Sequence, residues 1–472
     1  MMRQHLTLPH VIERDALDIG AQLNDALVLL DMHGAVLLRG FSVCTAADMA
    51  AALSTIKDRL TSLDDYFPAE SGRDDRTFAD GVTVWPTNSL RRTGGYLVPE
   101  VIPHTENLYA LQAPRVVAFC CETAPWFGGA TALFDGCAAL DTLPQRLRAK
   151  LAEPCCVRRV LSLARLRRRH AIDIADASAL ARWVHGVDPN ATIRDIVDDG
   201  PAGGKSASHD FVILETIRTV LSPTPPPLLA HSHTSTLTTS ARGALASSTK
   251  GATNGRAAPG GTAWVRFNFG EINDEPRARH ALLGGLLGAG FFSGRKWAVF
   301  RAVWAAALRQ PASVGQLLRA VDALPCWLAR PYSMLCRALV DECGAAAAEE
   351  AAFGKGGTCR RPARAAALPA ATETATQTAH ARGQSRRATS PRRGRRSPGD
   401  SPPLPPTLAE RLSDREAELL AASLASHVSA VEWQPGDLLL IDNAKVLHDG
   451  LPGLGPRKLH VALLQPAGAA PN

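Results

Sequence analysis

Residues 433–450 read WQPGDLLLIDNAKVLHDG, and they form one of the two most informative stretches of the chain. The triplet PGD at 435–437 predicts a turn, because proline and glycine favour turn conformations. The apolar run 438–442 after it predicts a buried strand that ends at an Asp-Asn pair. His448 lies just beyond, and Arg457 follows nine residues later in GPRKL, where another predicted strand begins.

The second informative stretch is PHTENLY, residues 103–109. In a strand, residues two apart point to the same face, so His104 and Glu106 can both reach one ion. An imidazole and a carboxylate are two of the three ligands of a two-His-one-carboxylate Fe(II) site. Alone, the pattern is weak, and a surface or hydrogen-bonded core histidine is the simpler explanation. A guanidinium beside such a site suits a dicarboxylate co-substrate, because it can pair bidentately with a carboxylate.

Strand-like and helix-like patterns run through most of the remaining chain. Short apolar runs predict strands, and apolar residues at helical spacing predict helices. Thr45 predicts a helix N-cap. The predicted strands are residues 34–41, 115–121, 130–134, 264–269, 438–442 and 458–464; the predicted helices are residues 16–30, a helix after Thr45, residues 140–151, most of 277–343, and 408–427.

Two segments lack these patterns. Residues 222–260 are rich in Gly, Ser, Thr, Pro and Ala and predict a loop insertion. Residues 344–408 form an Arg-, Pro- and Ala-rich insertion that predicts disorder, because it cannot bury enough apolar surface to offset the entropy of ordering. The remainder, 1–343 and 409–472, predicts one domain. Many strands with intervening helices predict a mainly β fold with decorating helices (α+β), as a sandwich or jelly roll with long insertions.

The positive charge of the chain is concentrated in one segment. The 472 residues carry a formal charge of +7, with 46% hydrophobic and 21% charged residues. Residues 354–400 hold eleven basic and two acidic residues, a net +9, so the rest of the chain carries −2. A nearly neutral body gives no reason to expect binding to nucleic acid or membranes. The basic segment itself admits three interpretations: a solvated linker, a nuclear-targeting signal or a weak nucleic-acid tether.

The cysteines and the apolar runs predict a cytoplasmic chain. Ten cysteines are present, with no CxxC and no zinc-ligand spacing. The first twenty residues carry no apolar core typical of a secretory signal. The longest apolar run, residues 281–292, is too short to span a bilayer. We therefore expect reduced thiols and no membrane partner, with nuclear localisation left open by the basic segment and the oligomeric state unknown.

Four other motifs are better explained without a function. His231 and His233 lie in a Pro/Ser/Thr-rich stretch with no carboxylate nearby, and a solvated loop explains them. GPAGGKS, residues 200–206, lacks the first glycine of a phosphate-binding loop. A dinucleotide-binding turn requires a strand directly before its glycines, and no predicted strand precedes the glycines of residues 284–290. His460 falls inside the last predicted strand and is expected to be a packed or edge histidine.

Taken together, several stretches resemble the TauD/TfdA-like oxygenases of the clavaminate synthase-like superfamily, and most of all its SyrP-like branch. The matching stretches occur in the family's order and cover about a quarter of the chain. They are GAVLLRGF (34–41), PHTENLYALQAPRVVAFCCETAPWFGGATALFD (103–135), WVRFNFGE (264–271) and WQPGDLLLIDNAKVLHDGLPGLGPRKLHVAL (433–463).

The resemblance implies a double-stranded β-helix, or jelly-roll, core and a site for iron. His104, Glu106 and His448 would be the Fe(II) ligands, and Arg457 would bind the C5 carboxylate of 2-oxoglutarate. Thr131, after Gly128-Gly129, would support that carboxylate, although an ordinary strand threonine is an equally good interpretation. The three ligands leave three positions for the co-substrates 2-oxoglutarate and dioxygen.

The implied reaction oxidises a C–H bond of a small amino-acid-like or carboxylate substrate and releases succinate and CO2. Hydroxylation or desaturation is favoured over halogenation, because Glu106 occupies the position a halide would need. Two features depart from the family: residues 155–260 keep little of its pattern, and Asp449-Gly450 follows His448 where Gly-Arg is common. A catalytically silent binding or scaffold protein therefore remains an alternative, as does a nucleic-acid-associated protein working through residues 354–400.

Overall fold

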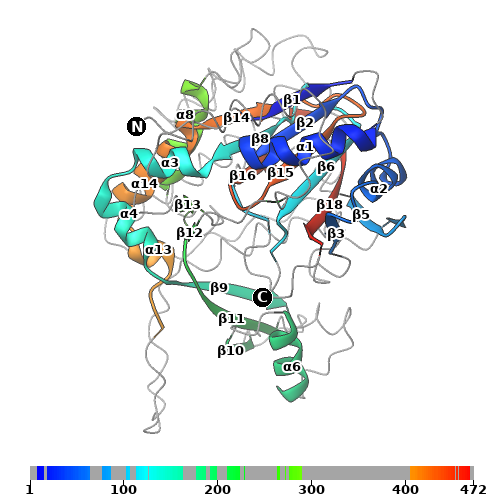
Figure 1. Cartoon of the computed structure of the whole chain (residues 1–472). Coiled ribbons are helices and arrows are strands. Elements are labelled where there is room, and N and C mark those ends of the chain that lie inside the picture. The colour runs from blue at the N-terminus through cyan, green and yellow to red at the C-terminus, as the bar shows by residue number, and fades with distance from the viewer. Residues whose placement is uncertain are drawn as a thin grey trace, which may run out of the picture.

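In the computed structural model, two β-sheets pack face to face and helices cover both outer faces (Figure 1). The ends of the chain contribute neighbouring strands, since the N-terminal β1–β2 pair lies beside a strand from the C-terminal region. The structure describes residues 8–14, 19–63, 77–86, 102–106, 113–125, 127–162, 177–187, 192–198, 210–223, 228, 263–265, 272, 276–289, 404–451, 453–454 and 457–467.

The larger sheet contains eight described strands, and the predicted strand 438–442 lies in its interior, with a partner on either side. All five residues of this strand are buried, as expected for a strand paired on both sides and covered on both faces. In the sheet the strands follow the order β1 (His10–Glu13), β2 (Ala35–Arg39), β15 (Leu438–Asp442), β6 (Val116–Thr123), β18 (Lys458–Pro466), β5 (Val82–Pro86) and β4 (Thr77–Ala79), and β3 (Leu60–Ser62) pairs with β18.

The smaller sheet places the strand that carries His448 beside the strand that carries Thr131. Both pairings in this sheet are antiparallel, and His448 lies opposite Leu133. The order is β14 (Val428–Val431), β8 (Thr131–Asp135) and β16 (Val446–Gly450), and a short pair, β7 (Phe127–Gly128) with β17 (Gly453–Leu454), extends from the same two chain segments.

Strict alternation along the strands divides the buried residues into layers. In β6, Val117 and Phe119 point into the sandwich, where they join a core with residues of the smaller sheet such as Leu133. Val116 and Ala118 point the opposite way, toward helices α1 and α2. Because successive side chains of a strand face opposite sides, one apolar run such as VVAFCC supplies two cores at once.

The helices close the two outer faces. Helices α1 and α2 pack on the larger sheet, whereas α3, α4, α8 and α14 gather over the smaller sheet (Figure 1). Thr45 caps α2 through a capping box with Asp48, as the sequence predicts. The helices are α1 (Ile19–His33), α2 (Ala46–Ser54), α3 (Gly136–Thr142), α4 (Gln145–Ala152), α6 (Ala177–Val187), α8 (Pro276–Gly288), α13 (Leu408–Arg411) and α14 (Asp414–Ser426).

A third group of strands extends away from the sandwich, below it in Figure 1. It belongs to the 155–260 region, in which the sequence keeps little of the family pattern. The group consists of β9 (Cys155–Ser162), β11 (Asp210–Arg218) and β10 (Thr192–Asp198) in one antiparallel sheet. A separate pair, β12 (Leu221–Pro223) with β13 (Ala263–Val265), lies against α3.

Three predicted element boundaries are wrong. The helix predicted at 140–151 is two helices, because Pro144 cannot continue α3 and instead caps α4. The helix predicted at 408–427 breaks before Ser413, which begins α14 with its own capping box to Glu416. Residues 446–450, which lie between two predicted strands and are not themselves predicted as one, form β16, which pairs with β8.

The prediction of a mainly β fold with decorating helices around a jelly-roll core is confirmed. Most of the predicted insertions 222–260 and 344–408, and the stretches 266–271 and 290–343, lie outside the described residues. The described end of the second insertion carries local structure: Cys156 N–H donates to Pro406, and Thr407 caps α13. Among the described helices, none combines the length and the apolar character that crossing a membrane requires.

Candidate metal centre

His448 reaches the interior of the sandwich from the middle of β16. Its neighbour Leu447 packs on the outer side with the helices, so alternation turns His448 inward. The side chain is only 4% exposed, and the ring edge meets Phe119 at a centroid distance of 5.5 Å. A buried imidazole held against an aromatic ring has little freedom to reorient, which suits a ligand that must keep one direction.

His104 lies opposite His448 in a single antiparallel bridge. The main chains exchange two hydrogen bonds, His104 N to His448 O at 3.1 Å and His448 N to His104 O at 3.0 Å. The sequence predicts a strand here, whereas the described residues around His104 form this bridge alone. His104 Nδ1 lies 2.8 Å from Ile102 O, so Nδ1 donates its proton to the carbonyl, and Nε2 is the ring nitrogen that remains for a metal, whose binding would displace any proton there.

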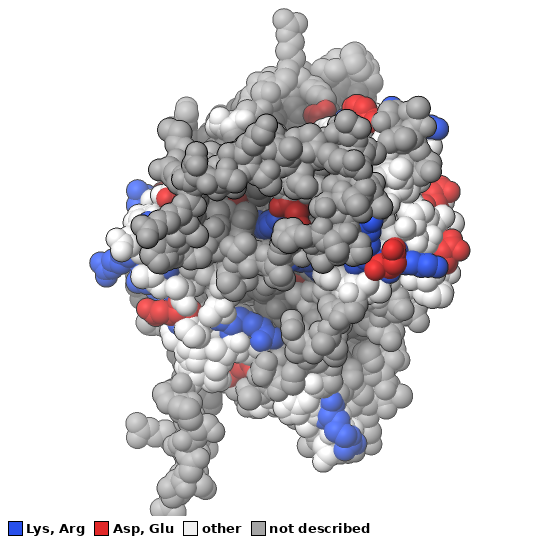
Figure 2. Space-filling view, viewed as in Figure 1, with Lys and Arg blue, Asp and Glu red and all other residues white. Residues whose placement is uncertain are grey.

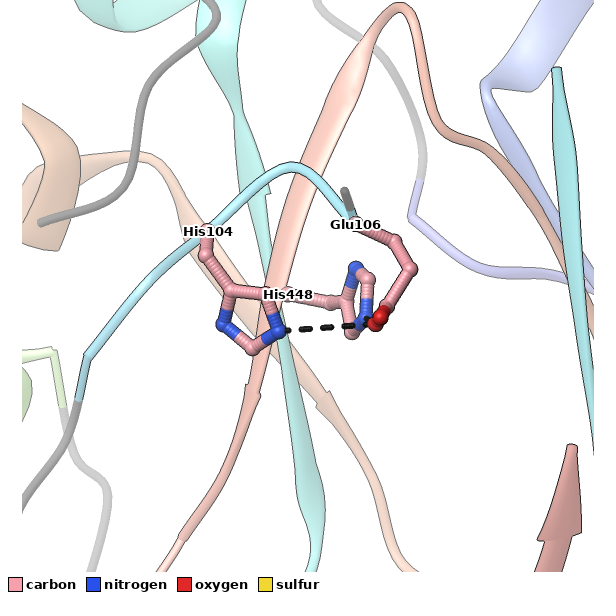
Figure 3. A group of neighbouring side chains, drawn as sticks. All are labelled: His104, Glu106 and His448. Carbon is pink, nitrogen blue, oxygen red and sulfur yellow. Dashed lines mark ion pairs between the residues drawn. The ribbon is translucent and has the colours of Figure 1, made fainter. Parts of the chain in front are cut away.

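Glu106 completes a cluster of three possible ligand atoms. Its Oε2 lies 3.7 Å from Nε2 of His104 and 3.7 Å from Nε2 of His448. All three atoms fall within 4.8 Å of one another. Figure 3 shows the two imidazole rings and the carboxylate turned toward one common point. Two imidazoles and a carboxylate arranged in this way can hold a divalent transition metal.

The electrostatics of the cluster favour a cation. Desolvation lowers the pKa of His104, but the hydrogen bond and the negative charge of Glu106 outweigh it and raise that pKa to about 9. The shift measures how strongly the carboxylate stabilises positive charge at the rings, whether carried by a proton or by a metal. The His104 side chain is 29% exposed, so the cluster is open to solvent on that side.

Arg457 is buried beside the smaller sheet with part of its donor capacity unused. Its Nη1 donates to Gly129 O at 2.8 Å, while Nε is buried with no hydrogen-bond partner among the described residues. A Cβ on Gly450 would lie 3.2 Å from Nη2, so glycine there leaves room for the guanidinium. Burial lowers the pKa of Arg457 to about 10, against the opposing charge of Asp449. A carboxylate ligand would supply the missing acceptor.

Thr131 lies next to this arginine region, opposite Gly450 in the β8–β16 pairing. Its hydroxyl accepts a hydrogen bond from the indole Nε1 of Trp433 at 3.0 Å, and both side chains are buried. Because the indole can only donate, the hydroxyl keeps its own proton for another acceptor. That geometry is compatible with a carboxylate ligand and with a purely structural strand threonine.

Two residues that sequence reasoning did not select also contact the site segment. Asn443 accepts from Glu106 N–H at 2.7 Å and donates to Glu106 O at 3.0 Å. Asp449 accepts a hydrogen bond from Ile102 N–H. In the sequence, Asn443 only marks the end of a strand and Asp449 only departs from the family pattern. Their partners lie more than 300 residues away, so no local pattern reveals these contacts.

Of the motifs that the sequence explains without a function, His460 is one that the structure describes. His460 Nε2 lies 2.6 Å from Glu122 Oε2, so it is a packed and paired histidine, as predicted. Residues 200–206 and 231–233 lie outside the described residues. On the face in Figure 2, the described Lys and Arg side chains are interspersed with Asp and Glu, which gives no support there to a nucleic-acid surface.

One comparison with known proteins matches the N-terminal part of the chain to a family. Residues 3–181 match the family described as taurine catabolism dioxygenase TauD, TfdA family. This range includes His104, Glu106 and Thr131, whereas His448 and Arg457 lie beyond it. No curated protein matches the sequence.

Solved structures show a more distant likeness. A taurine dioxygenase from Burkholderia xenovorans is 12% identical, with 98% of this chain and 89% of that chain covered and a TM-score of 0.34. PvcB, an Fe, alpha-ketoglutarate dependent oxygenase from an isonitrile synthetic pathway, is 12% identical, with 96% and 89% covered and a TM-score of 0.36. AAD-2, in complex with Mn(II) and N-oxalylglycine, is 9% identical, with 100% and 99% covered and a TM-score of 0.34.

TM-scores this low carry no weight in the assignment, which depends on the family match. The SyrP-like branch suggested by the sequence is not confirmed by these comparisons. The family match and the jelly-roll sheets agree, and Fe(II), 2-oxoglutarate and dioxygen are the co-reactants of this family. Over residues 3–181, the chain is therefore similar to the TauD/TfdA family of dioxygenases.

Proposed function

We propose that His104, Glu106 and His448 hold Fe(II) and that Arg457 and Thr131 bind 2-oxoglutarate in this chain. The observation that carries the proposal is the convergence of the three ligand atoms within 4.8 Å. Two of these residues lie more than 340 positions before the third in the sequence. A chance grouping of surface side chains would not explain why these three residues converge on one point, or why the backbone segments of His104 and His448 pair directly.

The residues of the chain divide the work of binding between them. His104 and His448 offer Nε2, and the Nδ1–H of His104 is directed to Ile102 O, which fixes its tautomer. Glu106 supplies the negative charge that a divalent cation requires. When bound together, Fe(II) and 2-oxoglutarate activate dioxygen for oxidation of a C–H bond. Arg457 would pair with the far carboxylate of 2-oxoglutarate through its unused Nε–H, and Thr131 would donate its hydroxyl proton.

The surroundings of the site favour oxidation in a sheltered space. Phe119 and Trp433 are almost fully buried beside His448 and Thr131, and they keep water from that side. Exclusion of water protects reactive species and strengthens electrostatic interactions. Since Glu106 occupies the carboxylate position, no place is left for a halide, so hydroxylation or desaturation is the proposed outcome.

The proposed substrate is a small amino-acid-like or carboxylate molecule. The family description names taurine catabolism, so taurine belongs in the first panel of candidates beside amino acids, simple carboxylates and betaines. Succinate formation that depends on one of these compounds would identify the substrate class. Absence of coupled turnover with every compound, together with absence of metal binding, would favour the silent scaffold alternative.

The proposed ligands are tested by anaerobic titration with Fe(II) and 2-oxoglutarate. The wild-type chain is expected to develop the weak visible charge-transfer band of an Fe(II)–2-oxoglutarate chelate. Replacing His104 or His448 by Ala removes one of only three protein ligands, so the band and succinate formation should be lost. Glu106→Ala should abolish hydroxylation while some iron binding survives, because both imidazoles remain.

The matched control for these variants is His460→Ala. His460 is an equally buried histidine, but it pairs with Glu122 rather than with the cluster. It should keep the band. A wild-type chain without the band, indistinguishable from His448→Ala, would contradict the proposal.

A further inference from the structure

The segment that carries His104 and Glu106 is held at three points by one stretch of chain, residues 443–449. Asn443 binds the main chain of Glu106, the main chain of His448 bridges that of His104, and Asp449 accepts from Ile102 N–H. All three attachments come from the turn after β15 and from β16. The relative placement of the proposed ligands therefore depends on this one stretch.

Asn443 is the attachment with the most complete hydrogen bonding. Its Oδ1 accepts from Glu106 N–H at 2.7 Å, and its Nδ2 donates to Glu106 O at 3.0 Å and to Pro114 O at 2.9 Å. The residue is 1% exposed. One acceptor and two donors satisfy one N–H and two carbonyls, so only one orientation of the amide fits all three partners.

The position of Asn443 is itself fixed from the other side. Its own N–H donates to Arg115 O at 2.9 Å. The preceding Asp442 is fully buried and accepts two hydrogen bonds from the Arg115 guanidinium, both at 2.9 Å. The Asp442-Asn443 pair therefore joins the start of β6 to the end of β15 and reaches across to the segment of Glu106.

We propose that Asn443 is a positioning residue for the metal centre, which clamps the Glu106 main chain so that its carboxylate meets the two imidazoles. The inference rests on the proposed role of Glu106 as a ligand. Asn443 itself does not touch the metal or the substrate. Residues that orient metal ligands in this way typically change metal affinity by about 10- to 100-fold when they are replaced.

The test measures Mn(II) binding by electron paramagnetic resonance of the free ion, without turnover. Asn443→Ala is expected to weaken Mn(II) binding by about 10- to 100-fold. In a background that already carries Glu106→Ala, the same replacement should weaken it by no more than about twofold, because the residue it positions is gone. This double-mutant cycle separates an effect through Glu106 from a general loss of structure.

Ser423→Ala is the matched structural control. Ser423 is a buried side chain with hydrogen bonds to Ala139 O and Thr142 Oγ1, in the helical layer over the smaller sheet. Its replacement should lower the unfolding temperature without changing Mn(II) affinity. Should Asn443→Ala fail to fold, Asn443→Asp serves in the same cycle, because it keeps the acceptor for Glu106 N–H and loses both donors.

The outcomes separate this inference from the proposed function. If Glu106→Ala weakens Mn(II) binding and Asn443→Ala does not, the positioning role is wrong and the proposed function stands. If Asn443→Ala weakens binding equally with and without Glu106, it acts on the fold, and the inference is again wrong. A wild-type chain that binds no Mn(II) would overturn the proposed function and the inference together.

Discussion

Arg457 is a buried positive charge that uses only part of its hydrogen-bonding capacity. It is 6% exposed, with Nη1 on Gly129 O and Nε without a partner among the described residues. Burial of a guanidinium is costly unless its donors are satisfied. Such a residue is therefore either a local source of strain or half of a ligand-binding pair, and replacing it distinguishes these two roles.

We expect Arg457→Ala to weaken 2-oxoglutarate binding by about 2–5 kcal/mol, the usual cost of truncating one partner of a buried charged pair. Fe(II) binding should change little, because the iron ligands are other residues. The 2-oxoglutarate affinity of Arg457→Lys should lie between those of wild type and Arg457→Ala, since an ammonium keeps the charge but cannot form the bidentate pair. Anaerobic titration of 2-oxoglutarate at saturating Fe(II), followed by the charge-transfer band, measures the affinities.

Lys458→Ala is the control for this pair of variants. Lys458 is the next residue, is half-exposed and pairs with Glu122 on the other side of the strand. Its loss should leave 2-oxoglutarate affinity unchanged. Equal affinity in Arg457→Ala and wild type would remove Arg457 from the binding site.

At the residue scale, sequence reasoning selected side chains that the structure brings together. His104, Glu106 and His448 carry metal-ligating groups in motifs that a family resemblance can identify. Asn443 was missed as a functional residue because its contribution lies in contacts with main-chain atoms 337 and 329 residues away. Hydrogen bonds to a distant backbone leave no periodicity or spacing that a single sequence displays.

At the scale of elements, the start of β1 and the end of α1 meet through two stacked imidazoles. The rings of His10 and His33 lie 4.6 Å apart at an interplanar angle of 17°. Burial lowers the pKa of both histidines, and the charge of His10 lowers that of His33 further. Protonation is therefore less favourable in the folded chain than in the unfolded chain, where a histidine titrates near 6.5.

This pair predicts a loss of stability on acidification. Above about pH 6.5 both histidines are neutral in either state, so their full contribution is present. As the pH falls below that value, the unfolded chain takes up more protons, and stability falls by up to about 1.4 kcal/mol per pH unit for each extra proton. Unfolding midpoints measured from pH 8 to pH 5 should fall less steeply for His33→Asn than for wild type.

The control is His185→Asn, which removes an exposed histidine of α6 outside this pair. Its midpoints should follow the wild-type slope. Parallel slopes for wild type and His33→Asn would mean that the stacked pair does not contribute to acid sensitivity.

Element boundaries show where local patterns stop being informative. Helix periodicity runs smoothly across Leu143-Pro144 and across Leu412-Ser413, yet the chain breaks at both. Proline lacks the backbone N–H that an uninterrupted helix needs. Serine is more favourable as an N-cap than inside a helix, so Ser413 begins α14 instead of continuing α13. Strand β16 is not evident from the sequence because it has only five residues, VLHDG, with no regular alternation of apolar and polar side chains. Its pairing with β8, rather than its strand propensity, defines it.

At the scale of the whole molecule, the described residues between 404 and 467 supply strands to both sheets. β15 lies between β2 and β6, β18 pairs with β6, and β14 and β16 flank β8. Short apolar runs predict the existence of these strands, whereas their order depends on contacts between distant segments. The mainly β fold could be predicted for that reason, but the sheet order and the four layers could not.

The same strand order leads to a prediction for residues 344–408. Their composition predicts disorder, and 354–400 holds eleven basic residues, after ten of which trypsin can cut; the exception is Arg361, which precedes Pro362. We propose that limited trypsin digestion cleaves this segment first. The resulting fragments should stay together, because the C-terminal piece contributes inner strands to the larger sheet and both edge strands to the smaller one. It cannot leave without breaking the β15–β2, β15–β6 and β18–β6 pairings.

Metal binding then becomes the measure of whether the cleaved molecule is intact. His104 and Glu106 lie on the N-terminal fragment and His448 on the C-terminal fragment, so Mn(II) can be held by all three only if the fragments remain assembled. We expect the digest to elute as one species in native gel filtration, to give two bands on a denaturing gel, and to keep the Mn(II) affinity of the uncut chain. Denaturing and refolding the fragments separately should abolish binding, and mixing them should restore it in part. Protection of the segment from trypsin would contradict the linker interpretation. Separation of the fragments on cleavage would instead show that covalent continuity, rather than sheet pairing, holds the two halves of the proposed iron site together.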